Sequence, residues 1–445
     1  MSARDYFKNK RIAVVGLGSH GEMVEDVKFL IKAGALVSVY DLKSEARLKN
    51  HLVFLRTIGL ANYVCGSIPA DDLLDMDMII LSHEYTRDAT FLEAVYTANS
   101  DGRSISIEYP ETLFFKLAPP VTIVGIMGAH GKSTLMSMLQ PLLEMACSSI
   151  DGQGFFVIDP ESNDGILANL KKIKNGDIVL FRIVGFIMKE LYKIRISPQV
   201  AVFTSVPADD SYDKSPFEIL SYQTYNNFIV ASDEIVDMTH SLKVQPKAKM
   251  LRTKPSIIPV DWQLNEKNFV HDREIAALAL QTASLFKVDN ESARNVLTRW
   301  KSPKGHLEMI KKVKNIEFYN DSASVSPTAV LMAIKTLSRD RNVVLIFGGA
   351  KSEGYYKPLY EVISQYVHTV VLLPGSGTLR ERNIIEKVPD LSVKSAPSIE
   401  EAVRMAVEST RKGDIVLFSP GFEAVGVDSS RKERGERFVR VVRGM

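Results

Sequence analysis

Cysteine and long apolar runs are scarce in this chain of 445 residues, whose only cysteines are Cys65 and Cys147. Two cysteines allow at most one disulfide, so we expect two buried thiols in a reducing compartment rather than a disulfide-stabilised secreted scaffold. No apolar run approaches the roughly 18 residues of a membrane span. The first ten residues also lack the apolar core of a secretory signal. We therefore expect a cytoplasmic protein with no membrane insertion.

An excess of charge of one sign is also missing. The chain has 55 lysines and arginines against 53 aspartates and glutamates, so no large field of one sign indicates a nucleic-acid partner. The apolar fraction of 45% and the charged fraction of 24% are those of an ordinary globular protein. At roughly 150 residues per domain, the length predicts two to four domains. We expect a monomer.

Short β-branched runs alternate with helical patterns from end to end, which predicts an α/β fold with parallel sheets. Pro119-Pro120 and Lys301–Gly305 interrupt this pattern as linkers. We predict three domains: a Rossmann-like domain at 1–118, a central P-loop ATPase-like doubly wound sheet at 119–300 and a C-terminal Rossmann-like domain at 301–445. The expected strands are Arg11–Val15, Leu36–Tyr40, Met76–Leu81, Val121–Gly125, Ile178–Phe181, Val200–Thr204, Val343–Phe347, Thr369–Leu373 and Ile415–Phe418. The expected helices include one ending near Lys32, one from Lys132, and His271–Phe286, Glu400–Glu408 and Arg431–Arg443.

The first motif is the G-x-G-x-x-G segment Gly16–Gly21, which lies between a predicted strand and a predicted helix. Glycines let the backbone approach a diphosphate, and a helix N-terminus offers unpaired N–H groups to it. Asp41 ends the next strand, where an acid that binds a ribose or a base belongs. The motif favours nucleotide binding over a tight turn without a ligand. Taken alone, it would also suit a nicotinamide-dependent oxidoreductase.

The second motif, Gly125–Thr134, combines a strand, a glycine loop, a lysine and two hydroxyls at the start of a helix. Its backbone N–H groups would hold phosphates, Lys132 would neutralise the β- and γ-phosphates, and Ser133 would hold Mg²⁺. The spacing departs from the common P-loop, because Ile126 stands where the first glycine should be. An oxidoreductase would leave this phosphate-binding loop unexplained.

This variant loop resembles the signature G-x-x-G-x-x-G-K-[ST]-[ST] of the Mur ligase family. The resemblance extends along nearly the whole chain and is strongest for the D-glutamate-adding branch, UDP-N-acetylmuramoyl-L-alanine:D-glutamate ligase. Further matching segments are His271–Ala277, Gly305–Glu308, Phe318–Pro327, Ile346–Gly349, Leu417–Gly421 and Glu433–Phe438.

The resemblance implies an ATP-dependent ligase of peptidoglycan synthesis that uses Mg²⁺, with UDP-N-acetylmuramoyl-L-alanine and D-glutamate as substrates. ATP phosphorylates the substrate carboxylate in this family, and the amine of the incoming amino acid attacks the acyl phosphate. The implied catalytic residues are Lys132, Asp209 and Asp321. The implied ATP-binding residues are Gly128, Ala129, His130, Gly131, Lys132, Ser133 and Thr134. The implied UDP-binding residues are Gly16, Gly18, Ser19, His20, Gly21 and Asp41.

Several positions depart from the family pattern. Arg182 stands where a metal-binding glutamate is usual, Asp210 replaces a metal-binding histidine, and Thr224 replaces a carbamylated lysine. Other altered positions, mainly in the C-terminal domain, are His306, Ala323, Ser326, Ser352 and Ala424. Losing one pre-placed charge or donor typically costs about 10²–10³ in rate. A nucleotide-binding paralogue that acts as a regulator or scaffold is therefore the alternative, and we predict that Arg182 pairs with Asp210 in place of a metal.

Overall fold

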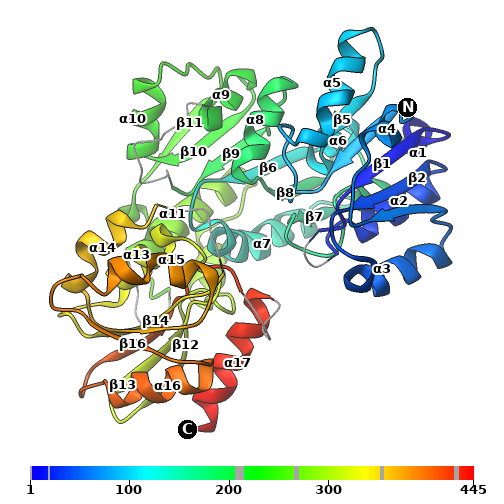
Figure 1. The fold of residues 1–445 in the computed structure, drawn as a ribbon. Coiled ribbons are helices and arrows are strands. Elements are labelled where there is room, and N and C mark those ends of the chain that lie inside the picture. The colour runs from blue at the N-terminus through cyan, green and yellow to red at the C-terminus, as the bar shows by residue number, and fades with distance from the viewer. Residues whose placement is uncertain (1–2, 19–20, 206–214, 265–269, 351–354, 425–429) are drawn as a thin grey trace.

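The computed structural model describes residues 3–18, 21–205, 215–264, 270–350, 355–424 and 430–445. Three sheets follow one another along the chain, each flanked by helices (Figure 1). This arrangement confirms the predicted α/β fold class with three units. In the described part of the chain, no helix combines the length and apolar character needed to cross a bilayer.

The first sheet consists of five parallel strands in the order β3-β2-β1-β4-β5. Its strands are β1 (Arg11–Val15), β2 (Leu36–Asp41), β3 (Asn62–Cys65), β4 (Met78–Leu81) and β5 (Ser106–Glu108). The accompanying helices are α1 (Ala3–Phe7), α2 (Val24–Lys32), α3 (Glu45–Thr57), α4 (Ala70–Leu74), the 3₁₀ turn η1 (Thr90–Leu92), α5 (Glu93–Ser100) and α6 (Pro110–Leu117). The central strands β1 and β4 are almost wholly buried, as expected for parallel strands covered on both faces.

The central sheet consists of six parallel strands in the order β11-β10-β9-β6-β8-β7. Its strands are β6 (Thr122–Met127), β7 (Phe155–Ile158), β8 (Ile178–Arg182), β9 (Val200–Phe203), β10 (Phe228–Ser232) and β11 (Lys249–Thr253). Its helices are α7 (Lys132–Ser148), η2 (Leu167–Lys171), α8 (Gly185–Lys193), α9 (Ser215–Glu218), η3 (Ile219–Tyr222), α10 (Asp233–Ser241), η4 (Pro255–Ile257), α11 (Val270–Ser284) and α12 (Asn290–Leu297). Because parallel strands end at one edge of the sheet, the loops that follow β6, β8 and β9 lie together.

The third sheet has the order β12-β13-β17-β14-β15-β16, in which β12 alone runs antiparallel to its neighbour. Its strands are β12 (Glu308–Val313), β13 (Ile316–Asn320), β14 (Val343–Phe347), β15 (Val367–Leu372), β16 (Ser392–Ser395) and β17 (Ile415–Phe418). Its helices are α13 (Pro327–Leu337), α14 (Lys357–Val362), η5 (Ile363–Gln365), α15 (Ser376–Ile385), α16 (Ile399–Glu408) and α17 (Arg431–Gly444). Helices α13 to α15 bury one face of the sheet, and α16 and α17 bury the other.

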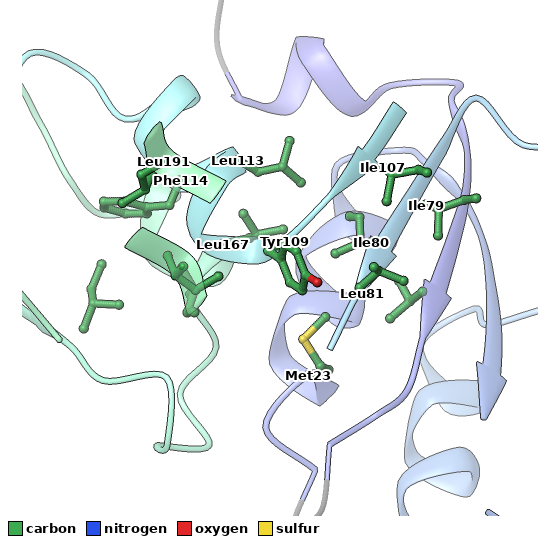
Figure 2. Packing of buried hydrophobic residues seen from close by; sticks show 14 of the residues in the cluster. Met23, Ile79, Ile80, Leu81, Ile107, Tyr109, Leu113, Phe114, Leu167 and Leu191 are labelled. Atoms are coloured by element: carbon green, nitrogen blue, oxygen red, sulfur yellow. The ribbon is translucent and has the colours of Figure 1, made fainter. Parts of the chain in front are cut away.

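One apolar core joins the first sheet to the near face of the central sheet. Figure 2 shows this packing, in which Leu113 and Phe114 of α6 approach residues of the central unit. The rings of Phe114 and Phe181 lie 5.3 Å apart between centroids. At the same boundary, the buried carboxylate of Asp26 on α2 accepts a hydrogen bond of 3.1 Å from the N–H of Ala168 in η2. The third unit has its own two clusters instead.

The predicted strands all exist, and the bounds of β1, β14 and β17 are as predicted. The bounds of the other six differ by one or two residues: β4 begins at Met78 rather than Met76, β6 covers Thr122–Met127 rather than Val121–Gly125, and β15 covers Val367–Leu372 rather than Thr369–Leu373. Strands β2, β8 and β9 end at Asp41, Arg182 and Phe203 rather than at Tyr40, Phe181 and Thr204. Strand β4 begins later than predicted because the carboxylate of Asp77 accepts a hydrogen bond from the N–H of Arg11. The pairing of β1 with β4 begins only after this contact, at Met78. The sequence analysis did not predict the strands β3, β5, β7, β10, β11, β12, β13 and β16. The domain boundaries at 118 and 300 stay predictions.

Candidate functional site

The glycine loop between β6 and α7 lies at the centre of the carboxyl edge of the central sheet, because β8 and β9 flank β6. Helix α7 begins at Lys132, directly after Gly131, whose φ of +78° suits glycine. Gly128 has a φ of +125°, and a Cβ atom there would lie 2.4 Å from Thr204 Oγ1 and 2.8 Å from the N atom of Ser205. The loop is therefore packed tightly against the end of β9 and leaves the N-terminus of α7 open to an anion.

Lys132 folds back over its own loop. Its Nζ donates hydrogen bonds to the carbonyl oxygens of Gly128 at 2.6 Å and Ala129 at 3.2 Å. Burial, and next the nearby Arg182 guanidinium, lower the pKa of Lys132 to about 8. A phosphate bound at this loop would raise this pKa, because it would add negative charge to that of Glu161 and Asp159, which already act on the ammonium.

His130 is a half-buried residue of the same loop. Its N–H donates to Ser205 Oγ at 2.8 Å, and its carbonyl oxygen accepts a hydrogen bond from Thr204 Oγ1. Burial and then Lys132 lower the pKa of the imidazole to about 4, so the ring is neutral at pH 7. Its Nε2 atom is buried and has no hydrogen-bond partner in the described part of the chain, which leaves one polar atom available beside the loop.

Arg182 ends β8 and pairs in register with Ile126 of β6, beside the glycine loop. Its guanidinium contacts Asp159 oxygens at 3.3 and 3.4 Å and binds Glu161 through two hydrogen bonds of 2.8 and 2.9 Å. The predicted partner Asp210 lies outside the described residues, so that pairing stays a prediction. The partners that the structure does describe follow β7, a strand that the sequence analysis did not predict.

The third unit faces the loop across a cavity of about 330 Å³. Residues 129–134 form one wall, and His306 and Asp321 belong to the opposite wall. Asp321 is buried, and its carboxylate accepts hydrogen bonds from the N–H of Leu307 at 3.2 Å and from Ser419 Oγ at 2.7 Å. Burial raises the pKa of Asp321 to about 7. Its visible role is to join the turn before β12 to the ends of β13 and β17.

His306 stands on the same wall, where the resemblance implies an arginine. Burial and then the Arg182 guanidinium lower its pKa to about 4, so the imidazole is neutral at pH 7. The cavity therefore receives its positive charge from Lys132, Arg182 and Arg431 rather than from His306.

The glycine motif of the first unit has left-handed φ values of +83°, +86° and +86° at Gly16, Gly18 and Gly21. Asp41 is fully buried, and its carboxylate accepts hydrogen bonds from the N–H groups of Leu17 at 2.9 Å and Lys43 at 2.8 Å. It holds the motif and the turn after β2 together. Ser19 and His20 lie outside the described residues.

A cavity of about 250 Å³ borders this motif at Gly18. Its lining includes four acidic residues that were not among the predicted site residues: Glu22, Asp26, Glu84 and Glu161. No sequence motif indicated this cluster, because its members come from the turn before α2, from α2 itself, from the loop after β4 and from the loop after β7. Two of these carboxylates are paired with cations, Glu84 with Lys43 and Glu161 with Arg182.

Comparisons with known proteins agree with this architecture. Residues 305–422 match the family model described as "Mur ligase, glutamate ligase domain". The UDP-N-acetylmuramoylalanine--D-glutamate ligase of Clostridium tetani is 25% identical over 99% of this chain and 98% of its own length. The same-named enzyme of Clostridioides difficile is 27% identical over 97% and 98%.

Along nearly its whole length, the chain is similar to Mur ligases.

Solved Mur ligase structures share the fold. The UDP-N-acetylmuramate-alanine ligase of Thermotoga maritima aligns with a TM-score of 0.56 at 15% identity, covering 98% of this chain and 100% of that one. The MurF ligase of Thermotoga maritima, solved in complex with ADP, aligns with a TM-score of 0.55 at 16% identity, covering 99% and 96%.

The chain departs from the pattern implied by the Mur ligase resemblance most clearly at the expected metal-binding positions. In the described part of the chain, no three His, Cys, Asp or Glu side chains gather into a group that could hold a metal ion. Arg182 stands where the resemblance implies a metal-binding glutamate, and its guanidinium would repel a cation. Thr224, where the resemblance implies a carbamylated lysine, is exposed and donates a hydrogen bond to Asn227 Oδ1. Asp209 lies outside the described residues, and Ser133 stays the predicted Mg²⁺ donor.

The altered positions of the C-terminal unit have local structural roles where they are described. Ser326 caps α13, because its Oγ accepts a hydrogen bond of 3.2 Å from the N–H of Ala329. The N–H of Ala323 donates to the carbonyl oxygen of Gly305 at 3.0 Å. Ser352 lies outside the described residues.

Proposed function

We propose that this protein is a Mur ligase, an ATP-dependent acid–amino-acid ligase that adds D-glutamate to UDP-N-acetylmuramoyl-L-alanine in peptidoglycan synthesis. The observation that carries the proposal is the glycine loop with Lys132, which faces a cavity walled on the other side by the third unit. Such a cavity can hold a nucleotide and a second substrate together, so that reaction becomes a matter of positioning. The names of the relatives from Clostridium tetani and Clostridioides difficile support the choice of substrates.

The proposed reaction has two steps. The muramoyl-alanine carboxylate attacks the γ-phosphorus of ATP and releases ADP, and the amine of D-glutamate then displaces phosphate from the acyl phosphate to form an amide. Lys132 would neutralise charge on the transferred phosphoryl group, and the N–H groups of residues 128–134 would bind phosphate oxygens. Ser133 would hold the Mg²⁺ that accompanies ATP. The UDP moiety would lie against the first glycine motif, in a monomeric, cytoplasmic enzyme.

Phosphate release by the purified protein tests this proposal. The assay contains ATP, Mg²⁺, UDP-N-acetylmuramoyl-L-alanine and D-glutamate, and mass spectrometry checks for the amide product. We expect release that requires all four components and that Lys132→Gln abolishes. Arg252→Gln is the control, because Arg252 forms exposed ion pairs with Asp233 and Asp237 on the same domain. Release that continues without the sugar nucleotide, or that survives Lys132→Gln, would contradict the proposal.

A second candidate is a nucleotide-binding paralogue without turnover, and the ion pairs of Arg182 favour it. A guanidinium held by Asp159 and Glu161 fills the position of a metal-binding glutamate, and losing several catalytic groups together can extinguish turnover. This candidate predicts that ATP binds, measured by calorimetry, while the full assay releases no phosphate above the Lys132→Gln background. Formation of the amide product would exclude it.

A further inference from the structure

Glu161 borders three cavities at once. It lines the acidic cavity of the first unit, the cavity of the glycine loop and a third cavity of about 520 Å³ between the central sheet and α17. It follows β7 by three residues, and its side chain is 48% exposed. A carboxylate at such a junction can move without being transferred into an apolar interior.

Three cations from separate parts of the chain surround this carboxylate. Arg182 of β8 binds it through two hydrogen bonds of 2.8 and 2.9 Å. Arg431, the first residue of α17, places an Nη atom 3.9 Å from it. Although burial alone would raise the pKa of Glu161, Arg182, Arg431 and then Lys132 hold it below its usual value. Convergence of two guanidiniums and an ammonium on one acid is the charge pattern of an anion site.

Both guanidiniums are fixed independently of Glu161. Arg182 also contacts Asp159 at 3.3 Å, and Arg431 binds Glu423 at 2.8 and 3.2 Å. If Glu161 moved away, each arginine would keep an acidic partner, while the ammonium of Lys132 would remain an uncompensated positive charge among them. The arrangement would then attract an anion at the mouth of the glycine loop, with room supplied by the 520 Å³ cavity that Arg182, Arg431 and Ser133 also line.

We propose that Arg182 and Arg431 form an anion site in which Glu161 is an internal occupant, and that the terminal phosphate of ATP on the glycine loop displaces Glu161 from it. This inference rests on the proposed nucleotide binding but holds for either candidate function. The phosphate then joins the central unit to the third unit, because Arg182 belongs to β8 and Arg431 to α17. Two guanidiniums thereby supply charge neutralisation that does not depend on a second divalent cation.

The competing explanation is a permanent ion pair that only stabilises the fold, and single variants separate the two. Glu161→Gln removes the internal competitor and retains the size of the side chain. We expect this variant to bind ATP about tenfold more tightly than the unchanged protein, a size typical of one charge-assisted hydrogen bond. A gain in affinity cannot arise from misfolding. Arg182→Gln should weaken ATP binding by about tenfold on the same basis.

Calorimetric titrations of the full chain with ATP, ADP and orthophosphate, each with Mg²⁺ and with EDTA, test the proposal. The double variant Glu161→Gln/Arg182→Gln should lose the gain of Glu161→Gln, and Arg252→Gln should match the unchanged protein. ADP affinity should change less than ATP affinity in every variant, because the site takes the terminal phosphate.

Unchanged or weaker ATP binding by Glu161→Gln would overturn the inference. Equal gains in affinity for ADP and ATP would also overturn it. A gain in affinity for orthophosphate without a gain for ATP would overturn it as well, because it would assign the site to a free phosphate. Failure of the unchanged protein to bind ATP at all would instead overturn the proposed function, so the two failures are distinguishable.

Discussion

Replacing Asp321 by asparagine should make the protein more stable at neutral pH and reduce the pH dependence of its stability. Burial raises the folded-state pKa of Asp321 to about 7, against 3.8 for an ordinary aspartate. The folded protein therefore keeps a proton that the unfolded chain releases above pH 3.8. The stability that this bound proton gives to the folded protein is fully present below pH 3.8 and is lost progressively as the pH rises towards 7.

The magnitude follows from these two values. Each unit of difference between the two pKa values corresponds to about 1.36 kcal/mol. The free energy of unfolding should therefore fall by at most about 4 kcal/mol between pH 4 and pH 8. An asparagine resembles the protonated acid: its oxygen can accept from the N–H of Leu307, and its amide can donate to the oxygen of Ser419. The variant thus keeps the geometry without the ionisation.

Urea unfolding of the unchanged protein and of Asp321→Asn at pH 5 and pH 8 provides the assay. We expect the free energy of unfolding of the unchanged protein to fall between these pH values, and that of the variant to fall by clearly less. The buried Asp26, whose pKa burial also raises to about 7, leaves the same residual slope in both proteins. Equal slopes for the two proteins would refute the conclusion that burial raises the pKa of Asp321 in the folded state.

Three further predictions concern packing and capping. Gly128→Ala should abolish ATP binding, because its Cβ would lie 2.4 Å from Thr204 Oγ1. Gly152→Ala is the control, because Gly152 also has a left-handed φ, of +78°, but no atom lies within 4 Å of the added Cβ; it should bind ATP normally in the same calorimetric titration. Phe114→Ala should lower the free energy of unfolding by about 3–5 kcal/mol, because it empties the core shared by the first two units, and urea denaturation will measure the loss. Ser326→Ala should destabilise by about 1 kcal/mol through loss of the cap of α13, with no change in ATP affinity. A loss of ATP binding in this variant would show that Ser326 contacts the nucleotide.

The buried strands could be predicted because their residues are apolar without interruption. β14 reads Val-Val-Leu-Ile-Phe and is wholly buried, which is the pattern of a parallel strand covered on both faces. The strands that were missed lie mainly towards sheet edges or carry polar residues. β12 contains two lysines and β16 is half serine, so neither has a distinctive apolar pattern.

The candidate site was predictable only where it is local in the sequence. The glycine spacing and Lys132 place the phosphate loop at the start of α7, because loop and helix are contiguous. Glu161 and Arg431 could not be found this way, since they meet only when the loop after β7 and the start of α17 are brought together. Likewise, the position of Asp41 at the end of β2 predicted an acid that binds a ribose or a base. It did not predict that the carboxylate would accept hydrogen bonds from the N–H groups of Leu17 and Lys43.

The apolar core that runs from the first sheet into the central one bears on which pieces of this protein can exist separately. A fragment that stops at residue 118 would bare Leu113 and Phe114 to water, and its hydrophobic patch would favour aggregation. A cut after residue 300 would expose no comparable apolar surface, because both faces of the third sheet are covered by helices of its own unit. If the units move relative to one another, we expect the third unit to move against the other two, which share a core.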